Sequence, residues 1–169
     1  NISVSAGGTT IRGEVLITDY GLEGNAVYPI VPMIRKELAS QPDTLLFLDL
    51  KPDNTSIQLL EKLKGKAAVS ETYSKALNLD SVRMALLKNY TTKSDFASQQ
   101  AVVQALKSLP SPIHSLRPIE EAISTVGGIP VDALDSDFSL KAFPHLYTIG
   151  EMVDWDTPTG GFLLQGCFA

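Results

Sequence analysis

The sequence holds one cysteine, two histidines and one tryptophan among its 169 residues. A single cysteine excludes an internal disulfide, and the thiol fits a reducing compartment. Cys167 lies in an apolar stretch of helical character, so we expect a buried structural thiol rather than a nucleophile. His114 and His145 each come shortly after a proline, and we expect both in turns or at the surface rather than acting as bases.

The chain also lacks the features of membrane and nucleic-acid proteins. No apolar run approaches the roughly 20 residues that span a bilayer, and no signal-peptide pattern begins at Asn1. Acidic residues outnumber basic ones, 19 to 14, and no stripe of Lys and Arg is present to neutralise phosphates. We therefore expect a cytoplasmic protein whose partners include neither nucleic acid nor a membrane.

The common catalytic fingerprints are missing as well. The sequence contains no G-x-G-x-x-G, no phosphate-binding P-loop, no G-x-S-x-G and no C-x-x-C. A hydrophobic content of 44% with 20% charged residues is nonetheless ordinary for a folded domain, and the length suits one domain or two small ones.

Hydrophobic patterning predicts an α+β fold. Alternating apolar residues indicate strands in about residues 1–18, with a turn at Gly7-Gly8, and a buried strand over Thr44–Leu50. Between them we expect a glycine-punctuated loop over 19–25. A helix then begins near Val27 and carries an apolar stripe at 27, 30, 34 and 38.

Residues 55–109 have helical periodicity and predict a small bundle. Thr55 or Ser56, Asp80 and Ser94 are candidate N-caps, and a short helix is expected near 73–77. The predicted apolar stripes are 57/60/63, 82/85/86 and 96/103/106, and Pro110 and Pro112 are expected to close the bundle. Beyond Ile113 we expect strands over 121–125 and 146–149 and a helix from Thr159.

Residues 150–162 carry most of the functional information, and their sequence is GEMVDWDTPTGGF. A predicted strand leads into Gly150 and Glu151, and Thr159, Gly160, Gly161 and Phe162 open the predicted helix. Two glycines let a ligand approach the backbone, and the unpaired amides of a helix start favour a partly negative atom. Glu151, at the end of a strand, can accept hydrogen bonds from hydroxyl groups. Without a ligand, the same pattern describes a plain tight turn.

The acidic side chains of this segment allow two further interpretations. Glu151, Asp154 and Asp156 could supply oxygen ligands to a divalent metal, as in a metal-dependent hydrolase, although their spacing does not match an EF-hand. A solvated acidic loop is the simpler interpretation, and we expect no metal here. Trp155 fits either a lid over a ligand or an anchor for the loop.

Two stretches together resemble the BaiN/YhiN-type bacterial flavoproteins, which are FAD-dependent oxidoreductases with a domain inserted into the dinucleotide-binding fold. The first is GEVLITDYGLEG over 13–24. The second runs from RPIEEAISTVGG at 117–128 through Gly150-Glu151-Met152 to the Thr159–Phe162 segment. The version with Trp155 and Pro158 is most similar to an uncharacterised subgroup with the pattern GEMxDWxxPTGG.

The resemblance implies a division of the chain. Residues of about 1–118 would be the inserted domain, with a small β-barrel-like part (about 1–50 and 113–118) and a helical subdomain (about 55–109). Residues 119–169 would be a partial β/α stub of a Rossmann-like FAD-binding domain. FAD would be bound by Gly150, Glu151, Thr159, Gly160, Gly161 and Phe162. The helix-start amides would then face the flavin edge that becomes anionic on reduction.

The resemblance further implies transfer of electrons or hydride between NAD(P)H and a small organic substrate, with no catalytic acid or base identified. Because the phosphate-binding fingerprint is absent from these residues, we expect the chain to be a piece of a longer protein. By itself it would be inactive and would bind FAD weakly or not at all. The alternative is a stand-alone ligand- or protein-binding module without redox chemistry.

Overall fold

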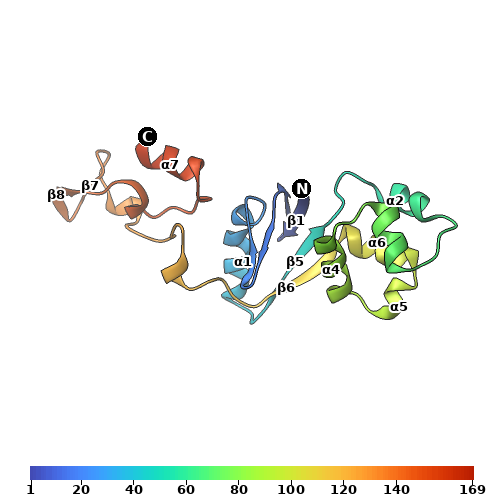
Figure 1. Cartoon of the computed structure of the whole chain (residues 1–169). Coiled ribbons are helices and arrows are strands. Elements are labelled where there is room, and N and C mark those ends of the chain that lie inside the picture. Colours follow the sequence, from blue (N-terminus) through green and yellow to red (C-terminus); the bar gives the residue numbers. More distant parts are fainter. The chain divides into compact units, whose positions relative to one another are not determined.

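A computed structural model describes all residues, 1–169, and they form two compact units, Asn1–Ser115 and Leu116–Ala169. Unit 1 contains a four-stranded sheet, a short hairpin, one helix beside the sheet and a bundle of five helices (Figure 1). Unit 2 contains a small hairpin, three short 3-10 helices and one α-helix. The α+β class expected from the sequence is confirmed.

The sheet of unit 1 is antiparallel throughout and has the order β2-β1-β5-β6. Strands β1 and β2 form a hairpin around the predicted Gly7-Gly8 turn. The four strands of the sheet are β1 (Ile2–Ala6), β2 (Thr9–Gly13), β5 (Thr44–Asp49) and β6 (Leu109–Ile113). Along β5, buried side chains at 44, 46 and 48 alternate with exposed ones at 45 and 47, so one face of the sheet is core and the other is open.

A second, two-stranded hairpin occupies part of the segment predicted to be a loop. Strand β3 (Leu16–Thr18) pairs with β4 (Gly21–Glu23), so the loop prediction for residues 19–25 is wrong at 21–23. The turn is confined to Asp19 and Tyr20, and the Thr18 hydroxyl bonds to the Gly21 carbonyl across it. Two three-residue strands are too short to show a clear alternating pattern in the sequence.

The core side of the sheet is covered by η1 (Tyr28–Ile30) and α1 (Val31–Leu38), as the apolar stripe predicts. Ile30 and Ile34 are buried against the same cluster that contains Val4, Leu46 and Leu48. The 3-10 turn precedes the α-helix because Pro29 and Pro32 lack amide hydrogens, which only a helix start tolerates.

The bundle follows β5 and returns the chain to β6. Its helices are α2 (Ser56–Leu63), α3 (Ser70–Leu77), α4 (Ser81–Tyr90), α5 (Lys93–Phe96) and α6 (Gln99–Lys107). The caps predicted at Thr55 and Asp80 are present, and Thr55 forms a full capping box with Gln58. Buried Tyr73 links the bundle internally, because its hydroxyl donates to the Phe96 carbonyl at 2.8 Å while its ring packs edge-on against Phe96.

Two details of the predicted bundle are wrong. The helix expected from Ser94 is two helices, capped by Thr92 and Ser98. Ile57 and Val82 are 70% and 52% exposed, whereas the bundle buries Leu59 and Leu63 of α2 and Met84 and Leu87 of α4. The stripes predicted for α2 and α4 were spaced correctly for a helix but were rotated about its axis, because the positions of neighbouring helices decide which face is buried. In the third stripe, Val103 and Leu106 of α6 are buried as predicted.

Pro110 and Pro112 do not close the bundle as expected; they lie inside strand β6. Leu109 and Ser111 are buried while both prolines are exposed. Because β6 is an edge strand, the amides of alternate residues pair with β5 and the prolines take the positions that face away from it.

Unit 2 is mostly irregular. It comprises η2 (Ile119–Glu121), η3 (Val131–Ala133), β7 (Ser139–Leu140), β8 (Phe143–Tyr147), η4 (Gly150–Met152) and α7 (Gly161–Phe168). The strand predicted over 121–125 is absent, since residues 119–121 form a 3-10 turn and no ladder follows. The strand predicted over 146–149 begins earlier, at Phe143, and ends at Tyr147. None of the helices in either unit has the length and apolar character needed to cross a bilayer.

Asp80 is an N-cap residue whose pKa is shifted by the contacts that it makes. Its carboxylate accepts from the backbone amide of Arg83 at 2.8 Å and is ion-paired with the Arg83 side chain. These contacts, the backbone hydrogen bond first, hold the pKa of Asp80 below its usual range. Because the pKa of Asp80 is lower in the folded than in the unfolded chain, its ionised carboxylate stabilises the fold at pH values above the unfolded pKa of about 3.9. This stabilisation is lost as the pH falls through the pKa of the folded state.

We expect Asp80→Ala to lower the free energy of unfolding by about 1 kcal/mol at neutral pH, the usual cost of an N-cap. Urea unfolding of both proteins should show that difference shrinking once the pH falls below about 4. Asp80→Asn is the control, because asparagine caps nearly as well and should stay close to wild type at neutral pH. A difference that is constant across the pH range would show that the cap does not depend on the ionised carboxylate of Asp80.

Candidate functional site

The segment 150–162 is held in unit 2 by a short parallel contact. The Ile129 amide donates to the Met152 carbonyl and the Asp154 amide donates to the Ile129 carbonyl, both at 2.9 Å. The approach is so close that a Cβ on Gly128 would lie 2.5 Å from the Met152 carbonyl oxygen. Gly128 is therefore required by contact with residues 152–154.

Gly150 and Glu151 begin the 3-10 turn η4, directly after Ile149. The Gly150 backbone lies beside α7, where an added Cβ would stand 3.7 Å from Cβ of Cys167. The Glu151 side chain is exposed. Cys167 is only partly buried, so the expectation of a fully buried thiol is not met.

Trp155 anchors the middle of this segment to α7. A Cβ on Gly166 would come within 2.3 Å of the indole ring of Trp155, so the ring lies directly over that glycine. The contact explains a glycine inside a helix, where it is normally unfavourable. Of the two roles considered for Trp155, the structure shows the loop anchor.

The start of α7 presents open backbone donors. Gly160 is the N-cap residue and has no side chain to bond the first amides of the helix. The amides of Gly161, Phe162 and Leu163 belong to the first turn and have no partner within the helix. A Cβ on Gly160 or Gly161 would meet nothing within 4 Å, so the space above these amides is open.

The predicted site residues thus occupy two ends of one helix. Gly150 and Glu151 lie near its C-terminal part, at Cys167, whereas Thr159–Phe162 form its start. Cys167 lies six positions after Gly161, which is about 9 Å along the helix axis. Any ligand that contacts both groups must be elongated along α7.

The acidic residues of the segment do not converge. Nowhere does the structure bring together three His, Cys, Asp or Glu side chains in a way that could hold a metal ion. Glu151, Asp154 and Asp156 are all exposed.

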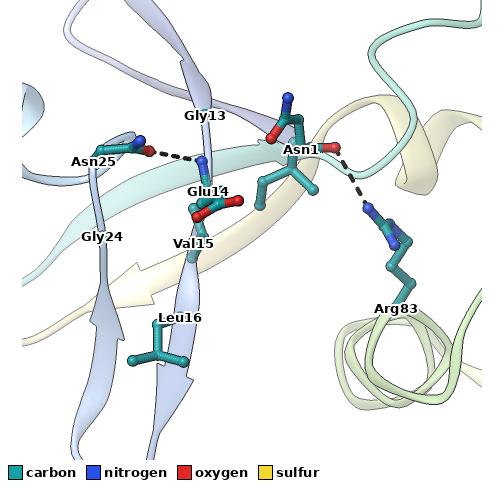
Figure 2. Close-up of a pocket in the computed structure, with 9 residues that line it drawn as sticks. Asn1, Gly13, Glu14, Val15, Leu16, Gly24, Asn25 and Arg83 are labelled. Carbon is teal, nitrogen blue, oxygen red and sulfur yellow. Dashed lines mark hydrogen bonds between the residues drawn. The ribbon is translucent and has the colours of Figure 1, made fainter.

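Unit 1 contains a cavity that the sequence did not indicate. It has a volume of about 490 Å³ and lies between the start of the sheet, the base of the β3–β4 hairpin and α4 (Figure 2). Of the side chains lining it, only those of Glu14 and Arg83 are charged. Its lining residues are Asn1, Ile2, Gly13, Glu14, Val15, Leu16, Gly24, Asn25 and Arg83.

The signal for this cavity was visible only in part. Gly13, Glu14 and Gly24 belong to the first stretch that carries the family resemblance, but no spacing rule connects them to Arg83, 69 positions beyond Glu14. Arg83 reaches the cavity because α4 packs against β6, two strands away from β1.

A family model described as the HI0933-like protein barrel and H2TH domain matches residues 1–124. The matched region is most of the 169-residue chain and includes all of unit 1. No curated protein matches the sequence.

The single tryptophan makes the Trp155 anchor directly measurable. We expect Gly166→Ala to push the indole off α7, because the new methyl group would overlap the ring, and to move the fluorescence emission of Trp155 to longer wavelength. Gln165→Ala, at the neighbouring exposed position of the same helix, should leave the emission unchanged. Identical emission spectra for Gly166→Ala and wild type would show that the ring is not seated there.

Proposed function

Because this chain belongs to the HI0933-like family of flavoproteins, we propose that it is part of an FAD-dependent oxidoreductase. The whole protein would transfer electrons or hydride between NAD(P)H and a small organic substrate. The family assignment favours this function over a stand-alone binding module. Bound FAD supplies the redox chemistry, and the residues described here bind and orient it.

We assign residues of about 1–118 to the inserted domain and 119–169 to part of the FAD-binding domain. Support comes from the match of the barrel and H2TH model to residues 1–124 and from the division of the chain after Ser115.

One observation carries the assignment of FAD to unit 2: the start of α7 offers unpaired amides beneath open space. Such amides, at the positive end of the helix dipole, stabilise a negatively charged or electron-rich edge of a ring system. A side chain on Gly160 or Gly161 would occupy that space. The residues present therefore fit the pyrimidine edge of a flavin.

Glu151 would bind hydroxyl groups of the ribityl chain. Its carboxylate is exposed and lies near the opposite end of α7 from Gly161. The flavin ring with its ribityl chain is elongated, as a ligand spanning the two groups must be. Trp155 and the Ile129–Val153 contact would fix the spacing between them.

The contacts proposed here leave the FAD phosphates without a binding loop, because no G-x-G-x-x-G occurs in residues 1–169. Phosphates are usually held by such a loop and the helix behind it. We propose that the complete protein provides that loop from outside these residues.

The complete reading frame that encodes this chain tests the proposal. Its product should purify yellow, and the released cofactor should be identified as FAD by chromatography. In that protein Glu151→Ala should weaken FAD binding by about tenfold, the loss expected for strong hydrogen bonds to one carboxylate. Glu120→Ala, which removes an exposed carboxylate elsewhere in unit 2, should bind FAD as wild type does.

Residues 1–169 alone give the complementary measurement. We expect them to lose FAD on a desalting column because the phosphate contacts are absent. Tight, stoichiometric retention of FAD by these residues would contradict the division of the site. A complete protein that contains neither flavin nor a dinucleotide-binding segment would refute the proposed function itself.

A further inference from the structure

The backbone of Glu14 is hydrogen-bonded on both sides, and its side chain takes no part in these contacts. The Glu14 amide donates to the Asn25 side-chain oxygen at 2.7 Å, and the Glu14 carbonyl accepts from the Ala26 amide at 3.3 Å. A Cβ on Gly13 would lie 2.4 Å from that Asn25 oxygen, and one on Gly24 would lie 2.6 Å from the Glu14 carbonyl oxygen. Two glycines and one asparagine thus hold Glu14 in place.

The Glu14 carboxylate is exposed and takes part in no hydrogen bond or ion pair. It stands at the cavity of unit 1, and Figure 2 shows Arg83 approaching the same space from α4. The backbone at Glu14 is therefore held by hydrogen bonds, whereas its carboxylate contributes no hydrogen bond or ion pair to the fold.

The guanidinium of Arg83 at the cavity already has partners within the fold. Arg83 is ion-paired with Asp80, its Nε donates to the Leu50 carbonyl at 3.1 Å, and its Nη2 donates to the Asn1 carbonyl at 3.4 Å. Since Asp80 balances the guanidinium, the Glu14 carboxylate and the amino group of Asn1 are the charged groups left at the cavity, and no ion pair joins them. Apolar side chains, those of Ile2, Val15 and Leu16, form part of the remaining wall.

We propose that this cavity binds a small primary amine, with the ammonium group on the Glu14 carboxylate and the apolar part against Val15 and Leu16. A hydrogen bond between ammonium and carboxylate is charge-assisted and so stronger than one between neutral groups. The volume of about 490 Å³ lies in the range of small-molecule sites. The Asn25 and glycine clamp holds the carboxylate ready, which reduces the entropy lost on binding.

This site lies wholly within unit 1 and is independent of the flavin site proposed in unit 2. Its test needs no cofactor, and failure of either proposal leaves the other standing.

The experiment is a titration of the ¹⁵N-labelled chain with n-pentylamine, followed by NMR at pH 7. The amine is protonated there, because alkylamines titrate near the lysine value of about 10.4. We expect saturable shifts of the amides of Gly13, Glu14, Gly24 and Asn25. In matched titrations, 1-pentanol and pentanoate should bind at least about tenfold more weakly than the amine, the factor expected for one charge-assisted hydrogen bond.

Two variants separate the site from general charge effects. Glu14→Gln keeps the backbone contacts of residue 14. It should weaken binding of the amine about tenfold, to the affinity of the alcohol for the wild-type chain. Glu61→Gln removes an exposed carboxylate from α2 and should bind the amine as wild type does. The Gly13 and Asn25 amide positions in the unliganded spectra check that both variants retain the hairpin.

Several results would overturn the proposal. Equal shifts with amine and alcohol, tighter binding of pentanoate, or no saturable shifts around Glu14 in the wild-type chain would each do so. Undiminished amine binding by Glu14→Gln would do so as well. The wild-type titrations alone suffice for the first three, whatever the behaviour of the variants.

Discussion

The pairing of β5 with β1 on one side and β6 on the other holds unit 1 together. Leu46 and Leu48 bury the inner face of β5 in the core. Leu50, directly after the strand, is also buried, and its amide donates to the Leu106 carbonyl in the bundle at 2.8 Å. Sheet and bundle thus share one hydrophobic cluster. The cavity depends on the same arrangement, because β1 supplies one wall while Arg83 arrives from a helix that packs on β6.

Local chemistry made much of the fold predictable. Thr55 and Asp80 were recognisable as caps, Gly7-Gly8 as a turn and Thr44–Leu50 as a strand, because each depends on neighbours within a few residues. The prediction that this strand is buried holds for one of its faces only, since Leu45 and Phe47 are exposed. The predictions failed where distant partners decide. Ile57 and Leu59 both fit a helical stripe, and only the packing of α2 against α3 and α6 buries Leu59. Prolines 110 and 112 signal a break in general, yet an edge strand accommodates them.

The two candidate sites differ in how far the sequence revealed them. The glycines at 160 and 161 and the carboxylate at 151 were identified by their place before a helix and after an apolar run, and the structure adds that they lie toward opposite ends of α7. The Glu14 cavity could not be identified in this way. Its clamp requires the β3–β4 hairpin to bring Asn25 back to Gly13, and that hairpin was expected to be a loop. A family resemblance drew attention to these residues without indicating a purpose for them.

The position of the prolines in β6 has a consequence for the molecule in a crowded solution. The outer face of the sheet exposes Leu45 and Phe47. An open sheet edge beside exposed apolar side chains can pair with strands of other chains and so lead to aggregation. At β6 that addition is blocked, because Pro110 and Pro112 present no amide hydrogen to an incoming chain. The sheet is therefore protected from growing into fibrous aggregates at this edge, and the protection comes from residue chemistry alone, without a covering helix.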